Sequence, residues 1–274
     1  MKNSVLWLEL RIRIRERRLW VVTCLYLLCL FAISFISLMI AENEGVAGDP
    51  AQTGLTIFAF SAFSLLGLLV IIGPLASAGS ITHEREQRTL PALLNTPLTP
   101  SSIVLGKLVA AWAFLLWLAS LSLPFLVLGV IWGAIDLGHF FAVLGVDMAA
   151  GMVASAIAIG LSGYFRRTLT SYLGTGAVMF LWLVVWPIFG LLCSALDRST
   201  YPYSHEQKAL FYIFFGHHVL APLIELLVPE VGATYSPAFV LPFALTVWTL
   251  IGIVFFLVAC RGVARAGSGA GGRP

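Results

Sequence analysis

Residues 55–81 of the chain are LTIFAFSAFSLLGLLVIIGPLASAGSI, a run without a single charged side chain. A helix of about 20 apolar residues crosses a hydrocarbon core roughly 30 Å thick, so this run is long enough to span a membrane. The whole chain agrees, because 59% of its 274 residues are hydrophobic and only 11% are charged. We therefore predict an integral membrane protein built from helices, since the apolar runs are continuous and do not alternate as in a membrane β-barrel.

Six apolar runs are expected to cross the membrane as helices. They cover residues 19–41, 55–81, 100–133, 140–164, 169–196 and 238–260. The predicted fold class is an all-α integral membrane protein in which residues 1–274 form one transmembrane domain. The first run follows Arg17 and Arg18 as a secretory signal would. It is too long for a signal core and has no small-residue cleavage site before Glu42, so we expect it to remain as a helix.

Lysine and arginine residues are divided unequally between the two sides of this map. One side receives fourteen of the sixteen, and the other receives only Arg198 and Lys208. Because cytoplasmic loops are enriched in Lys and Arg, both termini and the loop 82–99 are predicted to be cytoplasmic. We expect residues 1–18 to form a basic amphipathic helix on that surface, with a strand as the alternative, and residues 261–274 to form a flexible tail.

A seventh apolar run, residues 209–229, lies between the last two expected spans. As a full span it would move the basic C-terminal tail to the outer side. It also contains His217, His218 and Glu225, which are costly at the centre of a bilayer. We therefore expect residues 197–237 to be an external segment with re-entrant helices, covered by protein or water. The adjacent histidines would point in different directions on a helix, which favours a polar break over a metal or proton site.

The sequence contains no phosphate-binding loop of the form GxxxxGK[ST], so the chain is not expected to hydrolyse ATP by itself. The cysteines lie in or at the ends of apolar runs and lack the CxxC spacing of a metal site, which argues against a disulfide framework. We interpret them as small side chains buried in the membrane. They are Cys24, Cys29, Cys193 and Cys260.

Asp147 is the only acidic residue well inside a predicted span. A carboxyl group at this depth can serve a proton or substrate path, but a satisfied group that faces protein or an aqueous cavity is an equally good interpretation. One hypothesis for the chain is therefore a secondary transporter or channel that uses Asp147. Another is an intramembrane enzyme or scaffold that uses His217, His218 and Glu225. Neither hypothesis accounts for the loop that follows the second span.

That loop continues the opening run and is THEREQRTLPALLNTPLTP, residues 82–100; we call residues 82–99 the elbow. The elbow begins with charged and polar residues and continues with leucines at helical spacing, namely Leu90, Leu93, Leu94 and Leu98. Pro91 occupies a position that the first turn of a helix accepts, and residues 95–97 end that helix. Thr99 and Pro100 are typical of the cap and first residue of the next span. A short amphipathic helix is thus predicted between two spans.

These residues resemble the signature of the ABC-2 type transporter permeases. The matching run is Glu84-x-Glu86-x-x-Thr89-Leu90-x-x-Leu93-Leu94-x-Thr96-Pro97-Leu98, followed by Gly106-Lys107. Arg88 and Pro91 depart from the pattern, because a small residue and an acidic residue are common at those positions. The resemblance implies a permease subunit of an ATP-driven exporter in a prokaryotic plasma or inner membrane, in contact with lipid and acting as a homodimer or a related heterodimer.

The resemblance also implies how such a permease is driven. The short helix would be a coupling helix that docks a separate ATP-binding subunit, which would hold the ATP and Mg. No cofactor, metal, catalytic residue or nucleic-acid partner is expected in this chain. The leucines would supply buried contact area, and the charges would orient the docking. The residues implied to dock the ATPase are Glu84, Glu86, Arg88, Thr89, Leu90, Leu93, Leu94 and Pro97.

Overall fold

A computed structural model describes residues 17–43, 50–94, 98–185, 187–188, 218, 220–227 and 237–268. Within these residues every regular element is a helix. Five of the helices are long and apolar enough to cross a membrane. The chain is therefore a helical, multi-pass membrane protein, as the apolar runs predict. The basic segment 1–16 and most of the expected external segment, including His217, lie outside the described residues.

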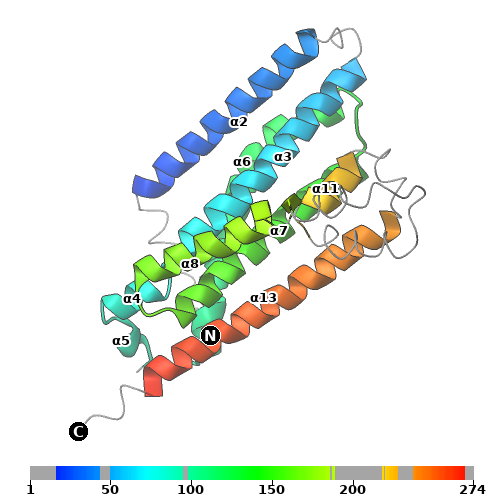
Figure 1. Ribbon diagram of the computed structural model, residues 1–274. Coiled ribbons are helices and arrows are strands. Elements are labelled where there is room, and N and C mark those ends of the chain that lie inside the picture. The colour runs from blue at the N-terminus through cyan, green and yellow to red at the C-terminus, as the bar shows by residue number, and fades with distance from the viewer. Residues whose placement is uncertain are drawn as a thin grey trace.

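The long helices run side by side, alternately up and down, as one bundle (Figure 1). They are α2 (Arg17–Asn43), α3 (Pro50–Ser77), α6 (Pro100–Ile131), α7 (Leu137–Tyr164), α8 (Thr168–Phe180) with its π-helical continuation η2 (Leu181–Val185), and α13 (Pro237–Ser268). Two short helices, α4 (Thr82–Glu86) and α5 (Leu90–Leu94), lie at one end, and α11 (Leu220–Leu227) lies away from it. The first expected span, 19–41, falls within α2, which is not one of those five helices, so six spans remain a prediction.

Helix α7 is the centre of the bundle, and 67% of its most apolar window is buried. Small side chains make this possible, because Ala150, Ala154 and Ala158 are fully buried and let neighbouring backbones come close. Leu69 of α3 and Leu115 of α6 fill the space beside this face. The small residues of α7 therefore let α3 and α6 pack closely against the centre of the bundle.

The predicted start of α6 is confirmed, and the structure shows a second cap at the start of α7. Thr99 caps α6, since its hydroxyl oxygen accepts a hydrogen bond from the backbone N–H of Ser102 at 3.3 Å, and Pro100 is the first helical residue. Asp136 caps α7, since its carboxylate accepts from the backbone N–H of Gly138 at 2.9 Å. Both caps lie at the ends of apolar runs, where unpaired N–H groups would otherwise meet the membrane surface.

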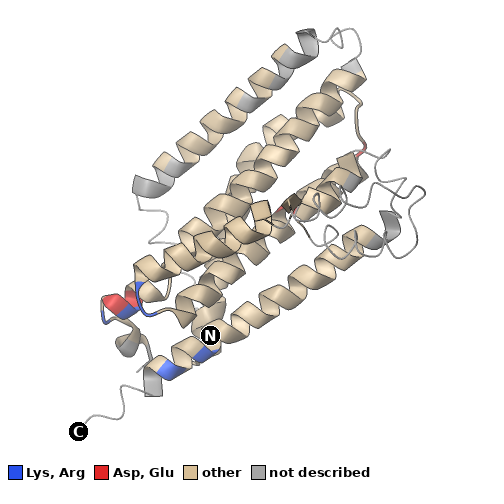
Figure 2. Ribbon diagram, in the orientation of Figure 1, with Lys and Arg blue, Asp and Glu red and all other residues tan. Residues whose placement is uncertain are grey.

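Positive charge gathers at one end of the bundle (Figure 2). We call it the basic end, and the lysine and arginine side chains that define it among the described residues are Arg85, Arg88, Lys107, Arg166, Arg167, Arg261 and Arg265. They come from α4 and the turn that follows it, from α6, from the α7–α8 turn and from α13, which are far apart in the sequence. Because successive helices run in opposite directions, the lysines and arginines of separate loops lie at the same end of the bundle.

Helices α7 and α13 touch through their backbones at the basic end. A Cβ atom added at Gly262 would lie 2.1 Å from the carbonyl oxygen of Gly163, and one added at Gly163 would lie 2.7 Å from the Cα atom of Ala259. Neither neighbour is the movable end of a side chain, so any substituent must push the helices apart. The two glycines therefore set the distance between these helices.

We expect Gly262→Ala to destabilise the bundle by about 1–3 kcal/mol, because the added methyl group overpacks a backbone contact. Gly252→Ala is the matched control on the same helix, since no atom lies within 4 Å of its added Cβ. The control should be neutral or stabilising by up to about 1 kcal/mol, as alanine is the better helix former. Thermal unfolding of the purified variants in one detergent measures both; equal melting temperatures for the two variants would refute the close contact.

Candidate functional site

The elbow turns sharply between its two short helices. Arg88 adopts a φ of +58°, the left-handed conformation that closes a helix C-terminus and that glycine or asparagine usually occupies. The turn is held because Thr89 donates to the carbonyl oxygen of Glu84 through its backbone N–H at 2.9 Å and its hydroxyl at 3.2 Å. Arg88, one of the two positions that depart from the resemblance, is therefore the point at which the chain reverses.

The leucine face of α5 packs on the bundle. Leu90 is only 1% exposed and lies in a core cluster with Ile81, Ile103 and Val263, which come from the residue before the elbow, α6 and α13. Leu93 and Leu98 are partly buried against the same cluster. Arg88, Thr89 and Ala92 are exposed, and we call these three residues the docking face. The side chains of Pro91 and Leu94, and residues 95–97 with Pro97, lie outside the described part.

A buried ion pair joins α4 to α6. The Lys107 ammonium donates to Glu84 Oε1 at 2.6 Å, and the two side chains are 1% and 27% exposed. A lysine so deeply buried in an apolar bundle requires an anionic partner, because an uncompensated buried charge is very costly. Glu84 therefore stabilises the second turn of α6 from across the elbow.

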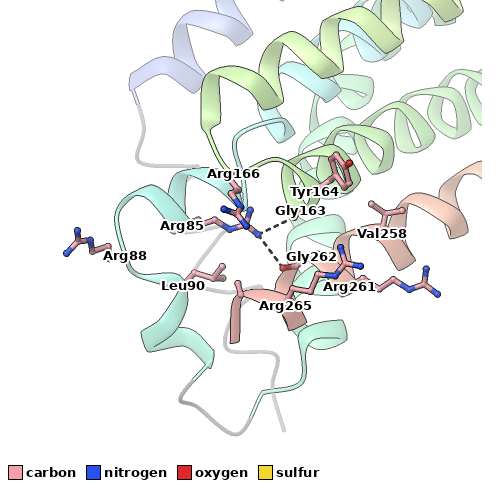
Figure 3. A pocket seen from close by; sticks show the side chains of 11 residues that line it. Arg85, Arg88, Leu90, Gly163, Tyr164, Arg166, Val258, Arg261, Gly262 and Arg265 are labelled. Carbon is pink, nitrogen blue, oxygen red and sulfur yellow. Dashed lines mark hydrogen bonds between the residues drawn. The ribbon is translucent and has the colours of Figure 1, made fainter. Parts of the chain in front are cut away.

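Arg85 joins the elbow to α7 and α13. Its guanidinium donates to the carbonyl oxygens of Phe165 at 2.5 Å, Gly163 at 3.2 Å and Gly262 at 3.3 Å (Figure 3). The first two carbonyls belong to the C-terminal end of α7, where a cation satisfies unpaired acceptors and the negative end of the helix dipole. One side chain thus spans the point where the two helices are in closest contact.

Glu86 and Ser162 complete these connections. Glu86 accepts from the backbone N–H and the hydroxyl of Thr168, both at 2.7 Å, and so places a carboxylate at the N-terminus of α8. The Ser162 hydroxyl of α7 accepts from the backbone N–H groups of Ile81 and Thr82 at 3.0 and 3.1 Å, at the start of α4. The five-residue helix α4 is therefore bonded to four long helices, α6, α7, α8 and α13.

The structure divides the residues that the sequence assigns to docking. Glu84 and Glu86 bond to long helices and Leu90 packs on the bundle, whereas Arg88 and Thr89 are exposed and lie in the turn that Thr89 closes on Glu84; Leu93 is partly exposed. The sequence analysis does not predict that Arg85 joins the elbow to other helices. The available signal was its position between Glu84 and Glu86, which both bond to long helices. For Lys107 the sequence signal was its position inside an apolar span, where a charged side chain needs an acidic partner.

Asp147, the acidic residue that the sequence places inside a predicted span, lies in α7. It is fully buried, and neither carboxylate oxygen has a hydrogen-bond partner within the described part of the chain. The hydroxyl of Tyr26 from α2 lies within electrostatic range of this carboxylate and beside Ser122 of α6. A polar spot thus occupies the middle of the bundle where three helices meet.

The predicted external segment is described only in part. The ring of His218 is buried, and its Nδ1 accepts from the backbone N–H of Leu220 at 3.2 Å, at the start of α11. His217 and the side chain of Glu225 are outside the described residues. Where side chains are described, no three of His, Cys, Asp and Glu come together in a way that could hold a metal ion.

Comparison with known proteins adds one match. A family model described as "ABC-2 family transporter protein" matches residues 3–260. The match contains the elbow, all of the spans with their connecting loops, and the position of every side chain that bonds α4 to its neighbours. No curated protein sequence matches the chain.

Proposed function

Since the chain belongs to the ABC-2 family of transporter proteins, we propose that it is the permease subunit of an ATP-driven exporter and that its elbow receives motion from a separate ATP-binding subunit. One observation carries the proposal: α4 is bonded to α6, α7, α8 and α13 at once. A push on a solvated loop would dissipate in the loop. A push on α4 would move four helices.

In the proposed assembly the basic end faces the cytoplasm, as the enrichment of cytoplasmic loops in Lys and Arg requires. Two permease copies, identical or related, form the path, and each elbow rests on an ATP-binding subunit that holds ATP and Mg. The permease itself performs no hydrolysis. Closure of the two ATP-binding subunits would tilt α4 and, through its contacts, shift the long helices as rigid bodies.

The docking face is the part of the elbow that we assign to the partner. Arg88, Thr89 and Ala92 are exposed, while Leu90 and Leu93 beside them pack on the bundle. A shallow apolar contact at Ala92 beside a cation at Arg88 suits a groove with an apolar floor and an acidic rim. The leucines of the elbow, which the sequence analysis expects to contact the ATP-binding subunit, would instead pack on the bundle and hold the docking face rigid.

A second candidate function has one specific observation in its favour. The buried carboxyl group of Asp147 has no hydrogen-bond partner among the described residues, as a proton or cation site in a secondary transporter would require. The same group near Tyr26 and Ser122 also suits a neutral carboxyl that only fills a polar spot in the bundle. The elbow contacts have no role in the secondary-transport mechanism, which is why we favour ATP-driven transport.

Asp147→Asn separates the two functions. The amide has nearly the shape of the carboxyl and carries no proton to transfer, so we expect the ATPase activity of the reconstituted complex to stay within about twofold and the melting temperature to hold or rise. The measurement is ATP hydrolysis in proteoliposomes, with and without an imposed pH gradient. Activity that depends on the gradient in the wild type and is lost in the intact variant complex would favour secondary transport instead.

A further inference from the structure

The side of α2 that packs on the bundle is polar. Its buried residues among those described are Thr23, Tyr26, Leu30 and Ser34, which recur at steps of three or four and so share one side of the helix. Three of these four side chains carry a hydroxyl group. Polar groups inside a membrane are costly unless they meet a polar partner. The boundary between α2 and the rest of the bundle is therefore suited to a polar ligand.

Side chains from three helices come together behind this polar side. Tyr26 of α2 has its hydroxyl beside Ser122 of α6 and within electrostatic range of Asp147 of α7. All three residues are at most 1% exposed, and we call them the Asp147 site. The Ser122 hydroxyl donates its proton to the carbonyl oxygen of Ala119 at 2.7 Å, which leaves its oxygen free to accept. Neither carboxylate oxygen of Asp147 has a hydrogen-bond partner in the described part of the chain. The site thus offers more acceptors than donors.

The charge of an ionised Asp147 would be uncompensated in this site. No described Lys, Arg or His forms an ion pair with it, and the described lysines and arginines gather at the basic end. An anion buried without a partner is very costly, so a proton or a cation must neutralise it. A proton supplies one donor, whereas an ammonium group cancels the charge and supplies up to three. An ammonium ligand therefore satisfies the carboxylate and the neighbouring oxygens together.

The surroundings of the site are apolar. Tyr26 belongs to the same core cluster as Leu65 and Leu118. A hard metal ion such as Ca²⁺ takes six to eight oxygen ligands, but the site offers only four, two from Asp147 and one each from Tyr26 and Ser122. An organic cation needs fewer oxygen ligands and can place an apolar chain against the cluster.

The position of α2 gives such a ligand a route into the bundle. This helix runs along the outside and packs on α3 and α6 (Figure 1). Its far side exposes Leu25, Leu28 and Phe31, each by more than half, as contact with lipid requires. Displacement of this one helix would therefore join the Asp147 site to the bilayer, where amphiphilic molecules concentrate.

We propose that the Asp147 site binds the ammonium group of a cationic amphiphile, whose alkyl chain lies between α2 and the bundle. The Asp147 carboxylate neutralises the cation, and the hydroxyl oxygens of Tyr26 and Ser122 accept its remaining N–H groups. That such an amphiphile is the exported substrate rests on the proposed exporter function. Its binding does not, because no ATP-binding subunit takes part in it.

The test uses the permease purified alone in an uncharged detergent at neutral pH. Dodecylammonium and dodecanol, which share a chain but differ in charge, are titrated separately, and native mass spectrometry counts the bound ligand. We expect dodecylammonium to bind at least about 30-fold more tightly, as for a buried charge pair, and Asp147→Asn to remove this preference. Tyr26→Phe keeps the ring and should weaken dodecylammonium binding about tenfold, since one hydrogen bond to a charged group is lost.

Asp136→Asn is the matched control. It makes the same change of acid to amide at the start of the same helix, where Asp136 is 67% exposed and asparagine is also a good cap. This variant should bind dodecylammonium within about twofold of the wild type, as expected for an exposed charge. The melting temperature of each variant shows that it is folded.

Four results would overturn the proposal. Equal affinity of the wild type for both ligands would leave Asp147 as a neutral carboxyl group, and unchanged binding in folded Asp147→Asn would place the ligand elsewhere. Equal losses in Asp147→Asn and Asp136→Asn would assign the effect to overall charge. Displacement of dodecylammonium by sodium chloride, but not by choline chloride at the same concentration, would assign the carboxylate to a metal ion. Because the ATP-binding subunit is absent, failure here leaves the exporter proposal intact, and failure of elbow docking leaves this one intact.

Discussion

Glu84→Gln should destabilise the permease by about 3 kcal/mol or more, because it removes the carboxylate from a lysine that is 1% exposed. The Lys107 ammonium would lose the carboxylate oxygen to which it donates at 2.6 Å and would remain in an apolar bundle. The elbow would also lose its bond to α6. Thermal unfolding in detergent, followed by the loss of monodisperse protein, measures the change.

Two further variants separate the ion pair from the packing around it. Lys107→Met should cost less, about 1–2 kcal/mol, because Glu84 is 27% exposed and can be hydrated when its partner is removed. The double variant Glu84→Gln/Lys107→Met should return close to the stability of the wild type, since neither charge remains to be compensated. Equal losses for the two single variants, or additive losses in the double variant, would show that the ion pair is not what these residues contribute.

The sequence predicted the bundle well because its signals are local. An apolar run long enough to span a membrane requires no knowledge of its neighbours, and neither does the cap at Thr99 and Pro100, which the structure confirms. The exception is α2, whose full length as a span remains a prediction. The charge count likewise predicted one basic end, which the fold assembles from four separate segments.

The function of the elbow's individual residues depends on contacts that are distant in sequence. Leucines at helical spacing predict an apolar face, but they do not reveal whether the bundle or a partner covers it; Leu90 is covered by the bundle. Arg85 meets Gly163 and Gly262, which lie 78 and 177 residues away. Only the crossing of α7 and α13 brings those carbonyls together, and no local pattern in the sequence encodes that crossing.

Because the bundle covers part of the leucine face, substitutions at the leucines are a poor test of ATPase docking. Aspartates at Leu93 and Leu94 would disturb the core cluster that Leu93 packs against, and a loss of binding could then come from a loosened elbow. The exposed docking face avoids this problem. Arg88→Gln/Ala92→Asp removes a cation and places a carboxylate on the outer side of α5, where Ala92 is exposed.

Co-purification of the ATP-binding subunit with the Arg88→Gln/Ala92→Asp permease is the most direct measurement of whether the elbow is the coupling site. We predict at least about 30-fold weaker binding, an effect of about 2 kcal/mol for a central interface position, with melting temperature and elution volume unchanged. Arg167→Gln/Thr170→Asp makes the same two kinds of change at exposed positions at the start of α8 and should retain the subunit. Full retention of the ATP-binding subunit by the elbow variant, or its equal loss from both variants, would contradict the account.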